Sequence, residues 1–271
     1  MNWERIISSP RDARSLERAK AMSELVDDIT MKDFQARYPG ISLKPIVALV
    51  AAYLEQDTIA SVLSAIPNEI SGLGVSTLVI VDGPGDATEE IATSHGAYVC
   101  AFPFNRGHGV ALKIGYQIAC SFGAGYIVTL DADGQNDPAE MPGLLEPILR
   151  DSADLVIASR RLGVDKTTNR LRKAGVYVFA TIINALTRQH LTDTSNGFRA
   201  MRADVVRNLR LEQEQYQTAE LLIAAARSGF RITERPTVWH PRAAGHSKKG
   251  NDILFGLRYA RVIARTWFRE L

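Results

Sequence analysis

Residues 126–138 read YIVTLDADGQNDP, an apolar run that ends in two aspartates one residue apart. Four further runs of aliphatic and β-branched residues lie at 46–52, 77–82, 97–102 and 155–159. Helical patterns alternate with these runs, at 58–66, 87–95, 109–122 and 138–150. Near-continuous apolar strands that alternate with helices are typical of a parallel sheet covered on both faces. The sequence therefore predicts an α/β fold with a Rossmann-like, mostly parallel sheet.

Acidic side chains follow three of these runs at the point where each run ends. They are Glu55, Asp82, and the pair Asp131 and Asp133. Ligands of open α/β sheets bind at the carboxyl ends of the strands. The sequence therefore predicts a pocket at this edge of the sheet.

The segments on either side of this alternating region have a different character. Residues 1–44 form a charged extension with a predicted helix at 11–28, expected to pack on the main domain or on a second subunit of a homo-oligomer. After residue 159 the alternation stops, and the predicted elements are helices at 170–188 and 218–227, an extended stretch at 231–240 and a last helix from 252. The predicted division is 1–44, 45–250 and 251–271.

Composition excludes several classes of protein. With 271 residues, 46% hydrophobic and 23% charged, the chain is neither disordered nor collagen-like. Two cysteines make no disulfide framework and suit a reducing cytosol, and the charged N-terminus does not match a signal peptide. The net charge of +2 combines −4 in residues 1–230 with +6 in residues 231–271. The last forty residues therefore favour a negative partner.

The Asp131–Asp133 turn has the chemistry of a cation site. Two carboxylates in a turn can face one hard cation that keeps open positions for phosphate oxygens. An EF-hand calcium loop is excluded, because Asn136 and Pro142 stand where that loop needs glycine and glutamate. Two solvated aspartates remain the alternative.

Two other turns carry polar groups toward the same edge. Asp82, at a strand end, is suited to accept hydrogen bonds from a nucleobase imide or a ribose. Residues 105–109 read NRGHG and open a helix, so the amides near Gly107 and His108 suit an anion. This loop is not a Rossmann fingerprint, because Leu112 takes the third glycine position, and no Walker A pattern occurs in the chain.

Six segments together resemble a known family. They read VAAYLE at 50–55, the Asp82 turn, NRGHG at 105–109, DADGQNDP at 131–138, SNGFR at 195–199 and RAAGHSK at 242–248. In this order they resemble family 2 glycosyltransferases, especially dolichol-phosphate mannose synthases and polyprenyl-phosphate glycosyltransferases. The resemblance covers about residues 45–250. It implies a GT-A fold, a nucleotide-sugar donor, and Mg²⁺ or Mn²⁺ as cofactor.

The resemblance also implies a role for individual residues. It assigns Ala52, Tyr53, Glu55 and Asp82 to the nucleoside, and Gly107, His108 and Ala132 to the donor site. It assigns Asp131, Asp133 and Gln135 to the metal. It assigns Arg242, Ser247 and Lys248 to the donor phosphates, and Asp193 and Arg199 to the acceptor. Family members usually read Pro-x-Tyr-Asn-Glu at the first segment and a second aspartate at Gly83. The choice between uridine and guanosine therefore stays open.

The function that follows from the resemblance is metal-dependent, inverting hexosyl transfer to a polyprenyl phosphate at the cytoplasmic face of a membrane. A lipid phosphate is already anionic near neutral pH and needs positioning, for which Arg199 is the candidate. A hydroxyl acceptor needs a base, for which Asp193 is the candidate, with a turn cap as its alternative. The competing functions are a soluble glycosyltransferase with a hydroxyl acceptor and a nucleotide-sugar-binding module without catalysis. No nucleic-acid partner is expected.

The last helix combines an apolar stripe with a basic arc. The expected stripe is Ile253, Leu257, Ala260, Ala264, Trp267 and Leu271, and the arc holds Arg258, Arg261, Arg265 and Arg269. Such a helix can lie in an anionic membrane interface or pack its stripe on protein. Both readings stay open at this stage.

Overall fold

The computed structural model describes residues 10–167, 170–244 and 252–269. The chain forms two compact units, residues 1–41 and residues 42–271. The first unit contains helix α1 (Pro10–Arg37), which runs nine residues beyond the predicted end at 28. Tyr38, Pro39 and Gly40 follow it as a turn, with Gly40 at a φ of +72°.

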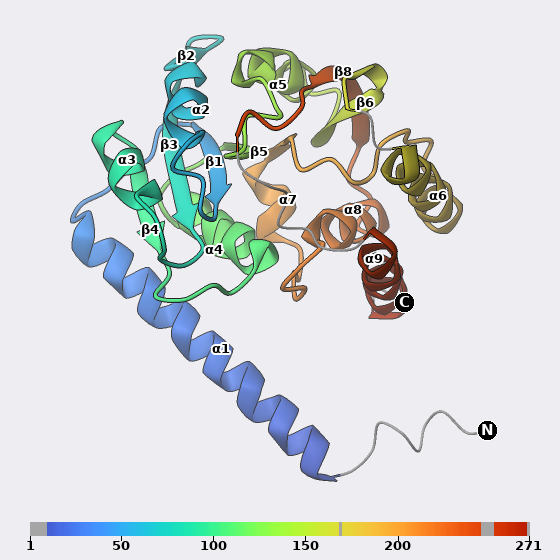
Figure 1. Cartoon of the computed structure of the whole chain (residues 1–271), viewed down its shortest axis with the longest axis horizontal. Helices are drawn as coiled ribbons and strands as arrows, with labels where there is room; N and C mark the ends of the chain where they lie inside the picture. The colour runs from blue at the N-terminus through green and yellow to red at the C-terminus, as the bar shows by residue number, and fades with distance from the viewer. Residues whose placement is uncertain (1–9, 168–169, 245–251, 270–271) are drawn as a thin grey trace. The chain divides into compact units, whose positions relative to one another are not determined.

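The second unit is built on one mixed sheet in the strand order β2-β3-β1-β5-β7-β6-β8, with β4 paired to β3 (Figure 1). The strands are β1 (Ile46–Ala52), β2 (Glu69–Ile70), β3 (Leu73–Val81), β4 (Tyr98–Ala101), β5 (Tyr126–Asp131), β6 (Leu155–Asp165), β7 (Arg199–Arg202) and β8 (Ile232–Trp239). Strands β4, β3, β1 and β5 are parallel neighbours, as the apolar runs predicted. Strand β7 was not predicted, and it pairs antiparallel with both β5 and β6.

Helices cover this sheet. They are α2 (Ile59–Ala65), α3 (Thr88–Ser94), α4 (His108–Ser121), α5 (Met141–Leu149), α6 (Arg170–Thr187), α7 (Ala203–Arg207), α8 (Gln217–Arg227) and α9 (Asp252–Arg269), with a 3₁₀ turn at Pro138–Glu140. Helices α6, α8 and α9 contact one another and form a group apart from α2 and α3 (Figure 1). None of the helices in the described residues is both long and apolar enough to span a bilayer.

Tight packing in the core fixes α4 against β1. Every residue of β1 is buried, and Leu49 and Ile114 have no exposed surface. A Cβ atom on Gly115 would lie 2.3 Å from Cδ1 of Leu49, so any larger residue would force the buried Leu49 side chain to shift. The first turn of α4 is thereby fixed beside the carboxyl ends of β1 and β5.

The packed face of α9 differs from the predicted stripe. The buried side chains are Tyr259, Val262, Ile263 and Thr266. Leu257, Ala260 and Ala264, which were predicted to form the stripe, are exposed. The predicted stripe was wrong because it was drawn along a different side of the helix, whereas the packed face combines two aliphatic side chains with a tyrosine and a threonine. The side chain of Ile253 and the whole of Leu271 lie outside what the structure describes.

Candidate active site

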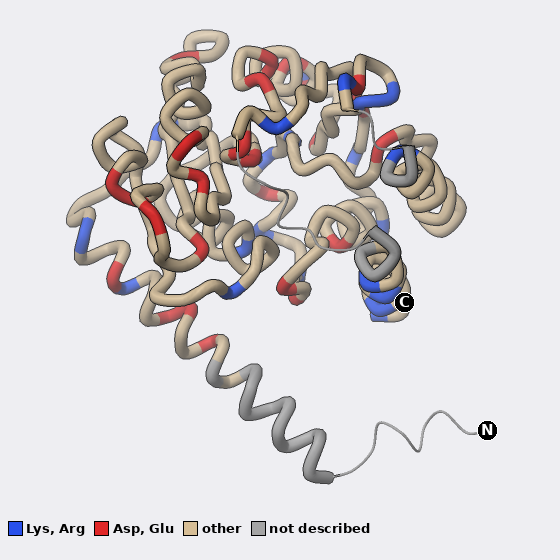
Figure 2. The backbone as a smooth tube through the Cα atoms, viewed as in Figure 1, with Lys and Arg blue, Asp and Glu red and all other residues tan. Residues whose placement is uncertain are grey.

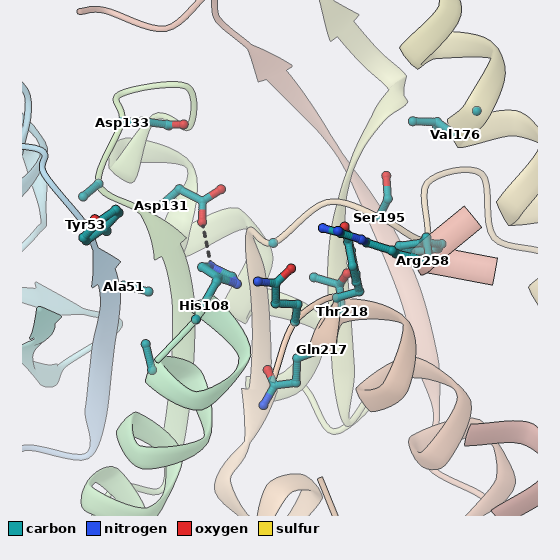
Figure 3. Close-up of a pocket in the computed structure, with 18 of the residues that line it drawn as sticks. Ala51, Tyr53, His108, Asp131, Asp133, Val176, Ser195, Gln217, Thr218 and Arg258 are labelled. Atoms are coloured by element: carbon teal, nitrogen blue, oxygen red, sulfur yellow. Dashed lines mark hydrogen bonds and ion pairs between the residues drawn. The ribbon is translucent and has the colours of Figure 1, made fainter. Parts of the chain in front are cut away.

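A cavity of about 740 Å³ lies at the carboxyl ends of β1, β3 and β5. One side, here the strand-end wall, comprises Ala51, Ala52, Tyr53, Glu55, Asp82, Asn105, Gly107, His108, Ala111, Asp131, Ala132 and Asp133. The other side, here the helical wall, comprises Ala174, Gly175, Val176, Val178, Phe179, Gln215, Tyr216, Gln217, Thr218, Gly256, Arg258 and Tyr259. Figure 3 shows Asp131 and His108 on one side, with Ser195, Thr218 and Arg258 across from them. The predicted pocket at the strand ends is therefore present.

Asp82 holds the loop that leads into α4. Its Oδ1 accepts a hydrogen bond from the backbone N–H of Arg106 at 2.6 Å, and both oxygens accept from the N–H of Gly107, at 3.2 and 2.9 Å. Oδ2 also accepts from Nδ2 of Asn105 at 3.2 Å. Burial raises the pKa of Asp82, and these backbone hydrogen bonds partly oppose that rise. Asp82 lines the cavity as predicted, with its carboxylate already used to shape the loop.

The N-terminus of α4 joins the two walls. His108 contacts Oδ1 of Asp131 through Nε2 at 3.3 Å, and the N–H of Gly109 donates to the carbonyl of Glu214 at 2.8 Å. Gly107 has a φ of +97°, and a Cβ atom there would lie 2.8 Å from the same carbonyl. Glycine is therefore required where the strand-end wall meets the segment before α8.

Arg242 lies among the carboxylates of the strand-end wall. Its Nη1 donates to both oxygens of Glu55 at 2.8 and 3.0 Å, and its Nη2 donates to Oδ2 of Asp133 at 2.9 Å. The hydroxyl of Thr58 donates to Glu55 at 3.1 Å and to the carbonyl of Ala132 at 2.8 Å. Although burial acts to lower the pKa of Arg242, its hydrogen bond to Glu55 and the charge of Asp133 raise it. The carboxylates of Glu55 and Asp133 therefore stabilise a positive charge at this position.

These residues fit a divalent cation. Asp131 and Asp133 both line the cavity with hard oxygen ligands, and a guanidinium already occupies one of the two carboxylates. Among the described residues, no three His, Cys, Asp or Glu side chains form a group that could hold a metal ion. Gln135 does not line the cavity, because its Nε2 donates to the carbonyl of His240 at 3.1 Å. Among the described residues, no contact joins the side-chain oxygen of Gln135 to Asp131 or Asp133.

Asp193 forms a buried ion pair with Arg160. Nε and Nη2 of Arg160 donate to the two carboxylate oxygens at 2.5 and 2.7 Å, and Nη2 also donates to the hydroxyl of Ser195 at 2.7 Å. Asp193 has no exposed surface. Burial acts to raise the pKa of Asp193, but the hydrogen-bonded guanidinium outweighs burial and holds that pKa below its ordinary value. Asp193 is thus buried, paired with a guanidinium and not part of the cavity lining, and its role as a general base stays a prediction.

Arg199 is also buried, with 1% of its surface exposed, and does not line the cavity. Its guanidinium donates to three backbone carbonyls, those of Asn196 at 2.8 Å, Thr218 at 2.7 Å and Thr194 at 2.8 Å. Arg199 therefore does not line this cavity, and its role at the acceptor stays a prediction. Arg199 instead fastens the loop at 194–196 to the start of α8.

With this geometry established, the chain can be compared with known proteins. The family model described as "Glycosyl transferase family 2" matches residues 48–210. The chain belongs to glycosyl transferase family 2. It is a glycosyltransferase that uses a nucleotide sugar, as the six segments implied.

Several known proteins are similar to this family 2 glycosyltransferase. It is 30% identical over 198 residues to a dolichyl-phosphate hexose transferase of Haloferax volcanii, covering 73% of this chain and 84% of that one. It is 28% identical over 220 residues to an undecaprenyl-phosphate mannosyltransferase of Micrococcus luteus, covering 77% and 89%. Glucosyl-3-phosphoglycerate synthase of Mycobacterium tuberculosis, solved with Mn²⁺, UDP and phosphoglyceric acid, superposes with a TM-score of 0.64 at 20% identity over 88% of this chain and 81% of that one. The GT-A fold is thereby confirmed.

Several lining residues of the glycosyltransferase were not predicted as site residues. These residues are Arg160, Ser195, Tyr216 and Arg258. Tyr216 has a φ of +59°, a strained conformation for a residue other than glycine. Arg160 directly follows the apolar run at 155–159, and this position was the signal in the sequence that could have identified it. Ser247 and Lys248 lie outside the described residues.

Proposed function

We propose that this family 2 glycosyltransferase is metal-dependent and inverting and transfers its sugar to a polyprenyl phosphate. The observation that carries the proposal is that one cavity joins a carboxylate-rich wall to an apolar wall that bears an arginine. The first suits the diphosphate of a nucleotide sugar, and the second suits a phosphate attached to a hydrocarbon chain.

On the donor side, we assign Ala52, Tyr53 and Glu55 to the nucleoside, beside the loop that Asp82 holds. Asp131 and Asp133 hold Mg²⁺ or Mn²⁺, which neutralises charge on the departing nucleoside diphosphate. The solved glucosyl-3-phosphoglycerate synthase binds Mn²⁺ together with UDP, which supports this assignment. Arg242 shares the neutralisation once it turns from the carboxylates to the phosphates.

On the acceptor side, the proposed chemistry needs no general base. A phosphate monoester has a second pKa near 6, so its oxygen is already a competent nucleophile at neutral pH. The pairing of Asp193 with Arg160 fits this requirement, because the carboxylate is already bound to a guanidinium. Attack by this oxygen on the anomeric carbon, on the side opposite the leaving diphosphate, inverts the configuration in one displacement.

The outer surface of the helical wall supports a lipid acceptor. Large apolar side chains are exposed on α6 and α9, namely Tyr177, Val178, Ile182, Leu257 and Phe268. Arg265 is exposed on the same α9 helix, which Figure 2 shows as a basic segment. Exposed apolar and basic side chains together favour peripheral contact with an anionic bilayer. The acceptors named for the Haloferax and Micrococcus relatives are lipid phosphates, which supports the same assignment.

The test is a transfer assay with UDP- and GDP-sugars, Mn²⁺ and undecaprenyl phosphate in detergent, preceded by thermal-shift measurements with each nucleotide. A correct donor raises the melting temperature, since a ligand at 100 Kd stabilises the folded state by about 2.7 kcal/mol. We expect a lipid-linked sugar of inverted anomeric configuration, formed only with metal. Transfer to free sugars but not to the lipid phosphate would refute the proposed acceptor.

A further inference from the structure

Three arginines line the cavity, and two of them are neutralised by acids. Arg160 is paired with Asp193, and Arg242 is paired with Glu55 and Asp133. Arg258 differs, because no acidic side chain of the described residues pairs with it and no hydrogen bond ties it to them. Within the described lining it is the arginine whose charge no carboxylate offsets.

The position of Arg258 is well defined by its neighbours. Tyr259, the next residue, is 1% exposed, and its ring packs on Phe179 at 4.6 Å and on Tyr216 at 5.8 Å between centroids. The hydroxyl of Tyr259 also donates to the carbonyl of Thr194 at 3.4 Å. Figure 3 shows Arg258 reaching into the cavity beside Ser195 and Thr218. The helix is thus anchored one residue away from a cation directed toward two hydroxyl side chains.

The surroundings indicate what this cation binds. Val176, Val178 and Phe179 of α6 give this end of the cavity an apolar lining. A guanidinium presents a planar fork of donors that matches phosphate oxygens. An anion attached to an apolar chain therefore fits this position better than a sugar or a free inorganic ion.

We propose that Arg258 binds the phosphate group of the acceptor, a phosphate monoester whose chain lies against α6. This inference rests on the proposed function for its place in the reaction, but the binding itself can be measured without transfer. It assigns acceptor selection to a residue of the last helix, in place of the buried Arg199. The same chemistry could come from a lipid phosphate or from a small soluble phosphate ester, and the test separates these two sources.

The test measures binding by calorimetry in detergent, using farnesyl phosphate, farnesol and glycerol 3-phosphate as probes. The variants are Arg258→Gln, Arg258→Lys and the matched control Arg261→Gln, which removes an exposed arginine of the same helix that does not line the cavity. We expect Arg258→Gln to weaken farnesyl phosphate about 10- to 100-fold, the range expected for a charged hydrogen bond, and to leave farnesol unchanged. Arg258→Lys should keep part of the affinity, and Arg261→Gln should keep all of it.

Each outcome decides the inference. Equal losses in Arg258→Gln and Arg261→Gln, or an unchanged preference for farnesyl phosphate over farnesol in Arg258→Gln, would overturn it. Glycerol 3-phosphate binding as tightly as farnesyl phosphate, and equally dependent on Arg258, would support the phosphate site with a soluble source. If wild type transfers no sugar to any phosphate acceptor while the Arg258-dependent binding persists, the proposed function fails and the site stands. Unchanged thermal shifts with nucleotide would show that the variants are folded.

Discussion

The two walls of the cavity use charge in opposite ways. On the strand-end wall, Glu55 and Asp133 are paired with Arg242, and Asp82 accepts hydrogen bonds from backbone amides. On the helical wall, apolar side chains surround Arg258, which has no acidic partner among the described residues. The proposed metal would compete with Arg242 for a carboxylate of the first wall, whereas the proposed acceptor phosphate would displace no carboxylate from Arg258. The donor side should therefore respond to metal and nucleotide together, and the acceptor side to phosphate alone.

The largest expected effect is on the strand-end wall. Replacing Asp133 by Asn removes a proposed metal ligand, and we expect kcat to fall about 100- to 1,000-fold, as when one transition-state charge stabiliser is lost. The measurement is a steady-state transfer assay over a range of Mn²⁺ concentrations. The matched control is Asp137→Asn, four residues further along the same turn, where the exposed side chain caps the 3₁₀ helix. Full activity of Asp133→Asn would remove the proposed metal role.

The second effect concerns the buried ion pair of Asp193 and Arg160. Asp193→Asn leaves Arg160 buried without a counter-charge, so we expect the free energy of unfolding to fall by about 3–5 kcal/mol. Urea denaturation measures this change. The control is Asp204→Asn, which breaks a pair with Arg207 in which the side chains are 68% and 43% exposed, and should cost about 1 kcal/mol or less. Equal losses of unfolding free energy in the two variants would mean that burial does not increase the contribution of the pair to stability.

The same pair predicts a dependence of stability on acid. Burial opposes ionisation of Asp193, yet its pKa in the folded protein lies below the ordinary 3.8 because Arg160 binds the carboxylate. The stabilisation is therefore complete above about pH 5 and is lost as the pH falls through the depressed pKa. Urea denaturation repeated between pH 7 and pH 3 should show a steeper loss for wild type than for Asp193→Asn. Parallel curves would contradict the assignment.

The smallest expected effect tests whether Arg242 and Mn²⁺ compete for Asp133. In Arg242→Gln, Asp133 no longer holds a guanidinium, so we expect Mn²⁺ alone to bind about 10-fold more tightly, a change of about 1.4 kcal/mol. Nucleoside diphosphate should bind about 10-fold more weakly in the same variant, because its phosphates lose a cationic partner. Electron paramagnetic resonance of Mn²⁺ and calorimetry measure the two affinities. Arg235→Gln, on β8 and paired with Glu146, is the control, and an unchanged Mn²⁺ affinity in Arg242→Gln would exclude competition.

The strand-end wall was predictable because its signals are local. An apolar run followed by a carboxylate marks a buried strand and its end, and the predicted bounds of β1 and β5 match the structure. The helical wall depends on facts that local patterns do not contain. Nothing in the sequence says that Arg199 is surrounded by carbonyls, or that Asp193 and Arg160, 33 residues apart, form a buried pair. The packed face of α9 was misjudged because its contacts are set by α6 and α8.

Strand β7 has a consequence for the order in which the molecule assembles. Strands β1, β3, β4 and β5 all lie before residue 132 and can pair as soon as they leave the ribosome. Strand β6 follows, but it borders β5 only through β7, which is made some forty residues after β6 begins. Until then β5 is an open edge, exposed to pairing with other chains. Such non-local pairing slows folding, so four residues, Arg199–Arg202, set the moment at which the two halves of the sheet close.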